Sequence, residues 1–254
     1  MALLEVNNLS KRFGGVQAVK DVSFGVEQGT IKAVIGPNGA GKTTLFNLVS
    51  GFVAPDSGSV SFGGAPLHGL GAHRVAAAGL SRTFQHIRLF SRMSALENVM
   101  VGCHVRGSSG FLAGMLSLPR TWQEERAIRE RALAAMEFLG IAGLADSEAT
   151  SLSYGQQRAV ELARALAAEP RMLLLDEPAA GLNMRETADL AKLITRIRDR
   201  GVTVLIVEHD MSLVMNISDE VAVLSYGEKI ADDRPLAIQK NPDVVRVYLG
   251  EDEC

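Results

Sequence analysis

The sequence predicts an α/β fold with a mainly parallel sheet and an all-helical insertion. Strand patterns alternate with helix patterns at both ends of the chain, as in a parallel sheet covered by helices. Between about residues 94 and 149 only helical patterns occur. A glycine-rich loop joins an apolar stretch at 31–35 to a helical stretch at 45–49, and this order of strand, loop and helix is the context of a phosphate-binding loop.

The composition narrows the class of protein. The chain has 254 residues, 47% of them hydrophobic, which suits one large α/β domain or a core domain with a smaller inserted one and excludes a disordered chain. Its net charge of −3 argues against a nucleic-acid partner. Cys103 and Cys254 have no metal-ligand spacing, so we expect free thiols in a reducing compartment.

Neither a targeting segment nor a membrane span is expected. Residues 1–7 include Glu5 and no long apolar run, so no signal peptide is predicted. No stretch approaches the roughly 20 apolar residues that a membrane span needs. We therefore expect a cytoplasmic protein that reaches a membrane only through a partner.

The elements before residue 85 are expected to be short and separated by turns. Residues 3–9 and 22–26 have strand patterns on either side of the turn-rich Phe13-Gly14-Gly15. The helix after the phosphate loop is expected to end near Gly51, followed by a turn at 55–58, a strand at 59–64, a helix at 73–78 and a strand at 80–84.

The helical insertion comes next, and the α/β pattern then returns. Helices are predicted at 95–101 and 122–139, with the apolar stretch at 107–119 between them as a surface hairpin or a short helix. The elements that follow are a helix from Ser153, a strand at 172–175, a helix at 185–200, a strand at 202–207, a helix at 211–217, a strand at 220–224 and a turn at 226–228 that leads into 229–231.

The loop at residues 36–44 has the residue types that phosphate binding requires. Glycines let backbone N–H groups approach phosphate oxygens, and the following helix N-terminus adds favourable partial charge. Lys42 supplies a mobile charge for the β- and γ-phosphates, and the Thr43 hydroxyl is placed to ligate Mg²⁺. The flanking strand and helix argue against a merely glycine-rich turn. The candidate phosphate-binding residues are Gly36, Pro37, Asn38, Gly39, Ala40, Gly41, Lys42, Thr43 and Thr44.

The strand predicted at 172–175 ends in two carboxylates. Side chains at the carboxyl end of a parallel strand point into the ligand crevice. We therefore expect Asp176 to hold Mg²⁺ through water and Glu177 to polarise a water that attacks a γ-phosphate. An acidic turn after a strand would explain the same residues, but the phosphate loop upstream favours the catalytic interpretation.

The helix predicted from Ser153 begins with a capping pattern. Ser153 and Gln156 fit a capping box, which explains both residues on local grounds. Gly155 beside the capping serine would also expose the positive helix end to an anion, an interaction worth about 0.3–2 kcal/mol. From this segment alone, capping is the better interpretation.

Together and in this order, the phosphate loop, the run Leu152-Ser153-Tyr154-Gly155-Gln156, the pair Asp176-Glu177 and His209 resemble the ATP-binding cassette (ABC) ATPases over nearly the whole chain. The resemblance makes 36–44 the Walker A loop, 172–176 Walker B and 152–156 the family signature. It implies a single ABC ATPase domain over 1–254, a P-loop NTPase with a mainly parallel core sheet, an N-terminal antiparallel β subdomain and an inserted α-helical subdomain. Residues 1–85 and 153–254 would form the nucleotide-binding core, and 86–152 the helical subdomain with the signature at its end.

The resemblance assigns roles that the residues alone do not. It makes Phe13 the aromatic residue that stacks on adenine, Gln85 the glutamine that senses Mg²⁺ and the γ-phosphate, and His209 the switch histidine that contacts the γ-phosphate. It implies ATP and Mg²⁺ as cofactors. The implied catalytic residues are Glu177, His209 and Gln85, and the implied Mg²⁺ ligands are Thr43, Gln85 and Asp176.

The resemblance also implies a second cassette. In the family, nucleotide lies between two cassettes, so Ser153, Gly155 and Gln156 would act on the partner's ATP. Two positions depart from the family pattern: Tyr154 stands where many members have glycine, and Asn183 where many have aspartate. An amide can hydrogen-bond across the dimer but carries no charge, which puts the cross-dimer coupling in doubt.

Several stretches resemble the LivG-type ATPase subunits of branched-chain or hydrophobic amino-acid importers, namely 11–19, 82–90, 97–99, 107–120, 178–183, 208–211 and 241–250. This implies an ATP-hydrolysing subunit on the inner face of the cell membrane. Its partners would be integral membrane permease subunits, a second cassette of the same or a sister type, and indirectly a periplasmic substrate-binding protein. Residues 86–97 would face the coupling helix of the permease.

Three other functions are weighed against this one. Cassettes for urea or lipopolysaccharide transport are close relatives of the LivG type. Soluble ABC ATPases of DNA repair or ribosomes usually carry long coiled coils or two cassettes, and this chain has neither. A scaffold that binds ATP without hydrolysing it would not need Glu177 and His209.

Overall fold

The computed structural model describes residues 2–85, 87–104 and 119–249. Its contacts divide the chain into two units, one of Met1–Arg82 with Arg171–Cys254 and the other of Thr83–Pro170. The predicted hairpin or short helix at 107–119 lies outside the described residues except for Pro119, and Cys254 lies outside them too. None of the described helices is long and apolar enough to cross a membrane.

The first unit contains an antiparallel sheet with the strand order β2-β1-β4-β5. β1 (Ala2–Phe13) and β2 (Val16–Glu27) form a long hairpin, and β1 also pairs with β4 (Ser57–Phe62), which pairs with the short β5 (Ala65–Pro66). The antiparallel N-terminal sheet is as expected. The sequence predicted only the apolar parts of the hairpin, because polar residues 10–12 and several register shifts near the turn disrupt the alternation.

The second sheet of this unit is the mainly parallel core that the sequence predicts, with the strand order β10-β9-β3-β8-β7-β6. Its strands are β3 (Ile31–Ile35), β6 (Leu80–Arg82), β7 (Met172–Asp176), β8 (Thr203–Val207), β9 (Glu220–Ser225) and β10 (Glu228–Asp233). Only β10 is antiparallel to its neighbour. β3, β7 and β8 are buried at every residue, as strands covered on both faces must be. Because Val34 and Asp176 both pair with Val207, the segments that follow these three strands leave the same edge of the sheet.

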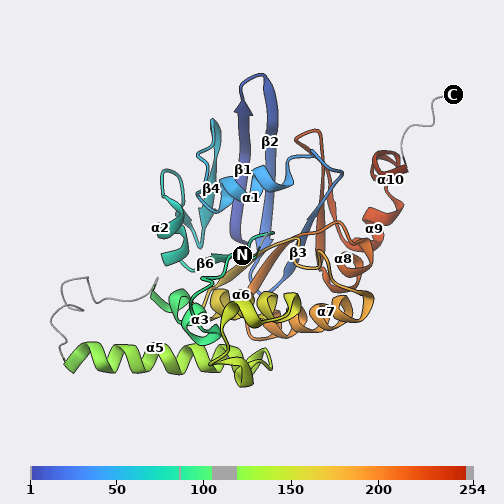
Figure 1. Ribbon diagram of the computed structural model, residues 1–254. Helices are drawn as coiled ribbons and strands as arrows, with labels where there is room; N and C mark the ends of the chain where they lie inside the picture. Colours follow the sequence, from blue (N-terminus) through green and yellow to red (C-terminus); the bar gives the residue numbers. More distant parts are fainter. Residues whose placement is uncertain (1, 86, 105–118, 250–254) are drawn as a thin grey trace. The chain divides into compact units, whose positions relative to one another are not determined.

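Helices of the first unit fix the two sheets to each other and cover the core. α1 (Lys42–Val49) is labelled in Figure 1. Its residues Leu45 and Phe46 are buried in one apolar core that includes residues of both sheets. The other helices are α2 (Ala72–Ala77), α7 (Met184–Asp199), α8 (Met211–Ile217), α9 (Pro235–Lys240) and α10 (Pro242–Leu249). α9 and α10 are not among the elements predicted from the sequence. Both begin at a proline, the residue that suits a first helical position.

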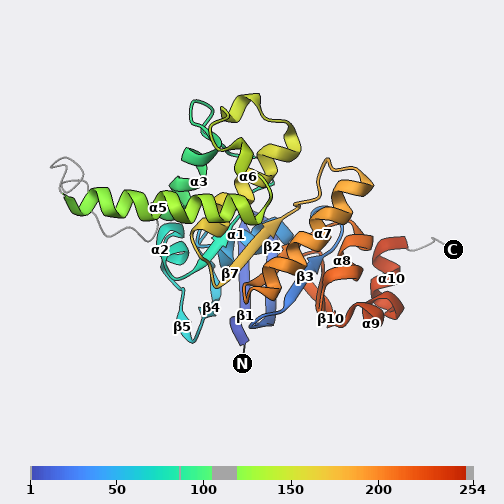
Figure 2. The same cartoon turned by 90° about the horizontal axis from the view of Figure 1, so that it is seen from below.

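The second unit is helical, as predicted. Its helices are α3 (Ala95–Cys103), α5 (Pro119–Phe138) and α6 (Tyr154–Ala167), all labelled in Figure 2, and the 3-10 turns η2 (Ala142–Leu144) and η3 (Ala149–Ser151). Residues of these segments form an apolar core of their own. A Cβ at Gly102 would lie 2.0 Å from the carbonyl oxygen of Arg164, so glycine lets α3 approach α6 closely. Because α6 packs on α3 and α5, the unit runs to Pro170, beyond the expected end of the helical subdomain at 152. The thiol of Cys103 is free and buried in this core.

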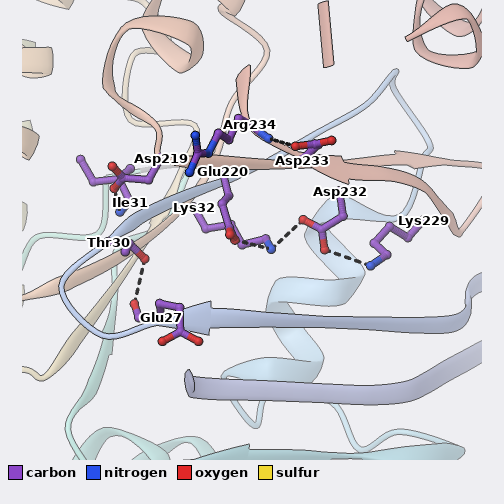
Figure 3. A network of polar contacts seen from close by, with 10 residues as sticks. All are labelled: Glu27, Thr30, Ile31, Lys32, Asp219, Glu220, Lys229, Asp232, Asp233 and Arg234. Carbon is purple, nitrogen blue, oxygen red and sulfur yellow. Dashed lines mark hydrogen bonds and ion pairs between the residues drawn. The ribbon is translucent and has the colours of Figure 1, made fainter. Parts of the chain in front are cut away.

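A buried lysine lies at the end of the core sheet opposite the phosphate loop, near the amino ends of the parallel strands. Lys32, the second residue of β3, is 3% exposed, and its ammonium lies 3.0 Å from Glu220 Oε2 and 2.7 Å from Asp232 Oδ1. The other oxygen of Asp232 pairs with Lys229 at 2.9 Å, and the ring of Phe24 lies 5.7 Å from the Lys32 ammonium. Figure 3 shows the ammonium between the two carboxylates, which join β3, β9 and β10.

This cluster gives two substitutions opposite expected effects. Asp232→Ala leaves the Lys32 ammonium buried beside Glu220 alone and is expected to lower the free energy of unfolding by about 1–3 kcal/mol. Lys32→Met removes the buried charge, keeps the bulk and leaves Asp232 paired with Lys229, so its cost should stay below about 1 kcal/mol. Urea unfolding measures both values. A larger loss for Lys32→Met than for Asp232→Ala would contradict this account.

Candidate functional site

The loop after β3 is fixed by close backbone contacts that only glycine permits. Gly36 and Gly41 have φ of +151° and +99°, conformations that side chains disfavour. A Cβ at Gly36 would lie 2.2 Å from the carbonyl oxygen of Leu224, and one at Gly41 would lie 2.3 Å from that of Ala18. Gly39 also has a positive φ, +82°, but a Cβ there would meet nothing within 4 Å. The loop is therefore held tightly at both ends between β9 and β2.

Hydrogen bonds from neighbouring segments fix the loop further. The N–H of Gly227, in the turn between β9 and β10, donates to the carbonyl of Ala40 at 3.1 Å. From α10, the hydroxyl of Tyr248 forms a hydrogen bond with the backbone of Gly36. Partial burial raises the pKa of this tyrosine to about 12 despite that bond, although 39% of the residue is exposed. α1 starts after Gly41 with no side-chain cap and no acidic residue in its first turn, so its positive end is not neutralised locally.

Lys42 brings a desolvated positive charge to the loop. Its side chain is 7% exposed, and the ammonium donates to the carbonyl oxygens of Gly36 at 2.7 Å and Pro37 at 2.9 Å. Burial lowers the pKa of Lys42, while the charges of Glu177 and Asp176 raise it by smaller amounts. The structure thus brings the predicted lysine and both predicted carboxylates into one electrostatic site.

Asp176 ends β7, is 3% exposed and has an ion-pair partner that the sequence does not predict. Arg82 Nη2 lies 2.8 Å from Asp176 Oδ2, and Arg82 Nη1 donates to Asn47 Oδ1 and Ser50 Oγ of the α1 segment, both at 2.8 Å. One buried guanidinium therefore joins β6, β7 and the helix that follows the phosphate loop. Thr43 lies in the first turn of that helix with its side chain exposed.

Glu177 and His209 come together beyond the ends of β7 and β8. Glu177 has a φ of +46°, which is costly for a residue with a Cβ, and its N–H donates to the carbonyl of Val207 at 2.9 Å. His209 Nδ1 lies 3.9 Å from Glu177 Oε2, and the imidazole is 63% exposed. The strained backbone aims the carboxylate beside an accessible histidine, an arrangement able to move protons at a bound substrate.

Phe13 is exposed at the end of the β1–β2 hairpin. Its ring is 48% exposed, and the Lys11 ammonium lies 5.6 Å from the ring centroid. Phe13 pairs with Val16 at the start of β2, and Ala18 of the same strand contacts the loop at Gly41. The hairpin end therefore lies beside the phosphate loop, where an exposed aromatic face can accept a base.

The second unit carries the other predicted residues. Gln85 is exposed, and Arg158 of α6 donates from Nη1 and Nη2 to the carbonyls of Phe84 and Gln85, both at 2.8 Å. At the start of α6, Ser153 Oγ accepts from the N–H of Gln156 at 3.4 Å, and Gln156 Oε1 accepts from the N–H of Ser153 at 2.9 Å. The predicted capping box is confirmed.

Asn183 has a structural role that was not predicted from the sequence. It is the N-cap of α7, and its Oδ1 accepts from the N–H groups of Arg185 and Glu186, both at 3.0 Å. Glu186 returns the bond by accepting from the N–H of Asn183 at 2.9 Å, which completes a capping box. The spacing of Asn183 and Glu186 was a visible signal for this cap.

The donor set favours a metal ion that enters with a phosphate ligand. Among the described residues no group of three or more His, Cys, Asp and Glu side chains could hold a metal ion. The Thr43 hydroxyl in the first turn of α1 and the Asp176 carboxylate at the end of β7 are hard oxygen donors, of the kind that Mg²⁺ uses together with phosphate oxygens and water. These residues fit Mg²⁺ bound with a nucleotide.

The phosphate loop with its closely packed glycines, the buried Asp176 at the end of β7 and the strained Glu177 beside His209 are the arrangement of a P-loop ATPase. The helical unit contains residues 152–156, which resemble the family signature. A family model described as ABC transporter matches residues 19–180, and one described as Branched-chain amino acid ATP-binding cassette transporter matches residues 228–254. The chain belongs to the ABC transporter ATPases.

Relatives place the chain in one branch of that family. It is 46% identical to the high-affinity branched-chain amino acid transport ATP-binding protein BraF of Pseudomonas aeruginosa, over 98% of each chain. It is 43% identical to LivG of Escherichia coli K12, a protein with the same description, again over 98% of each. A crystal structure of an ATP-binding cassette of an ABC transporter in its ADP conformation matches with a TM-score of 0.86 at 33% identity, over 99% of this chain and all of that one. The expected fold and family are confirmed.

The two glycine positions allow a matched test of the loop. Gly41→Ala adds a Cβ 2.3 Å from a backbone oxygen as well as positive-φ strain, whereas Gly39→Ala adds only the strain, about 1–2 kcal/mol. We expect Gly41→Ala to lower the melting temperature further and to abolish binding of a fluorescent ATP analogue, with weaker effects for Gly39→Ala. Equal losses in both variants would show that backbone conformation, and not close approach, sets the requirement for glycine.

Proposed function

We propose that this chain is the ATP-hydrolysing subunit of an ABC importer that drives uptake of branched-chain or other hydrophobic amino acids through separate membrane subunits. The observation that carries the catalytic part is the convergence of Lys42, Asp176, Glu177 and His209 at one edge of the core sheet. The near full-length similarity to BraF and LivG supports the transport part.

ATP would bind across the exposed surface of the first unit. The backbone N–H groups of the loop and the uncapped start of α1 would hold the phosphates, Lys42 would pair with the β- and γ-phosphates, and Phe13 would stack on adenine. Mg²⁺ would be held by Thr43, Asp176 and Gln85 and would neutralise phosphate charge. The remaining contacts would come from Gly36, Pro37, Asn38, Gly39, Ala40, Gly41 and Thr44.

Glu177 would then polarise the attacking water, and His209 would contact the γ-phosphate. The positive φ of Glu177 and its bond to Val207 hold the carboxylate in place, which supports a role that needs fixed geometry. Gln85 would report the state of the nucleotide to the helical unit, because its backbone carbonyl accepts a hydrogen bond from Arg158 of α6.

A second cassette would complete the site. Ser153, Tyr154 and Gly155 are exposed at a helix start, and that position suits an anion held by another chain. Ser153, Gly155 and Gln156 would contact the partner's ATP, whether the partner is an identical chain or a sister subunit. Residues 86–97 would contact the permease at the inner face of the membrane, and a periplasmic binding protein would deliver substrate to that permease.

Glu177→Gln tests the catalytic assignment. The amide keeps the size of the side chain but cannot serve as a base, so we expect the ATPase rate to fall by about 10²–10⁴-fold while ATP binding is retained. Steady-state phosphate release and equilibrium binding of labelled ATP measure the two properties. Equal, negligible rates in wild type and variant would contradict the ATPase assignment and favour a nucleotide-binding scaffold.

Uptake in cells tests the transport assignment. In cells that lack this chain we expect uptake of radiolabelled leucine, isoleucine and valine to fall, and wild-type protein but not Glu177→Gln to restore it. Unchanged uptake, or the absence of permease and periplasmic-binding-protein genes beside the gene, would count against an amino-acid importer and leave urea or lipopolysaccharide transport to be assayed in the same cells.

A further inference from the structure

We propose that Glu208 is a positioning residue that joins the loop after Glu177 to the loop that carries His209, so that the two catalytic groups keep their working geometry together. This inference rests on the proposed function, because it assigns Glu208 a role through those two residues. Neither the phosphate loop motif nor the acidic strand end points to Glu208.

The carboxylate of Glu208 divides its two oxygens between the two loops. The side chain directly follows β8 and is fully buried, at 0% exposure. Its Oε1 accepts from the N–H of Ala179 at 2.8 Å, two residues beyond Glu177. Its Oε2 accepts from the N–H groups of His209 at 3.0 Å and Asp210 at 3.4 Å. One side chain thus connects two segments that are 29 residues apart in sequence.

The cost of this arrangement indicates that the connection is specific. A buried carboxylate is unfavourable unless hydrogen bonds replace water. Burial raises the pKa of Glu208, while the N–H groups of Ala179, His209 and Asp210 lower it by smaller amounts. A buried apolar residue would avoid the desolvation cost but would leave the N–H of Ala179 buried without this acceptor.

Each loop is ordered within itself, and Glu208 joins the two beyond the end of the sheet. After β7, the N–H of Ala180 donates to the carbonyl of Glu177 at 3.1 Å. After β8, Asp210 caps α8 by accepting from the N–H of Leu213 at 3.1 Å. Backbone pairing reaches as far as the bond from Glu177 to Val207, and the Glu208 carboxylate adds the next connection outward. His209 Nδ1 lies 3.8 Å from Glu208 Oε2 and 3.9 Å from Glu177 Oε2, so loss of this connection would act directly on the catalytic pair.

Glu208→Gln should break one of the two connections while the size of the side chain stays nearly the same. An amide has one accepting oxygen, so it can serve one loop but not both. Amide hydrogen exchange should therefore become faster in peptides that cover 178–183 or 209–213, whereas the central strand at 31–35 should stay protected. We expect kcat for ATP hydrolysis to fall by about 10- to 100-fold, with KM and ATP affinity within about twofold of wild type. In a His209→Ala background the further loss in kcat should be smaller than in the wild-type background, because the part of the effect that passes through His209 is already absent.

Two further variants serve as controls. Asp232→Ala, at the opposite edge of the sheet, is expected to lower stability but to keep the wild-type kcat at temperatures well below unfolding. Glu208→Asp keeps a carboxylate on a shorter side chain and provides a second test of the role of Glu208 if Glu208→Gln does not fold. It is expected to show the same local exchange and a smaller loss of kcat.

The outcomes separate this inference from the proposed function. Faster exchange in either loop with a lowered kcat supports the role of Glu208. Wild-type exchange in both loops, a uniform rise over the whole core, or fully additive losses with His209→Ala would overturn it. A wild-type rate in Glu208→Gln beside a slow Glu177→Gln would overturn the role of Glu208 alone. A wild-type rate in Glu177→Gln would count against the proposed function itself.

Discussion

Close backbone packing around the phosphate loop is the constraint on which the rest of the site depends. Carbonyl oxygens of Ala18 and Leu224 occupy the positions that side chains at Gly41 and Gly36 would need. The loop is therefore held between β2 and β9, and α1 begins at a fixed point against both sheets. A loop held in this way presents its N–H groups without first losing conformational entropy, which is how preorganised sites gain affinity.

The charges around the loop depend on that fixed position. Arg82 donates hydrogen bonds to Asn47 and Ser50 of the α1 segment and forms an ion pair with Asp176 of β7. The Cζ atom of its guanidinium lies 5.7 Å from the centroid of the Phe46 ring. Without this guanidinium, Asp176 would be a buried carboxylate with no ion-pair partner at 2.8 Å. The buried cation therefore links these elements and compensates the negative charge of Asp176.

Local features of the site could be predicted from the sequence, and long-range ones could not. The glycine spacing, the capping box at Ser153 and the burial of β7 depend on a few adjacent residues, and the sequence contains all of them. The pairing of Arg82 with Asp176 joins residues 94 apart, and no periodicity or spacing indicates it. Asn183 is different: its spacing to Glu186 is a local signal for a cap, whereas the resemblance to the family implies only a contact across the dimer.

The start of α6 shows how capping and anion binding can belong to one structure. A capping box satisfies one N–H in the first helical turn and that of the cap residue, and other N–H groups of that turn have no partner within the helix. In α6 the box orients Ser153 and fixes the first turn, while Gly155 adds no side chain over the helix end. A capping box and an anion at the remaining N–H groups are therefore compatible at one helix end. The same reasoning extends to Asn183, whose cap orders the start of α7 directly after the loop that Glu208 holds.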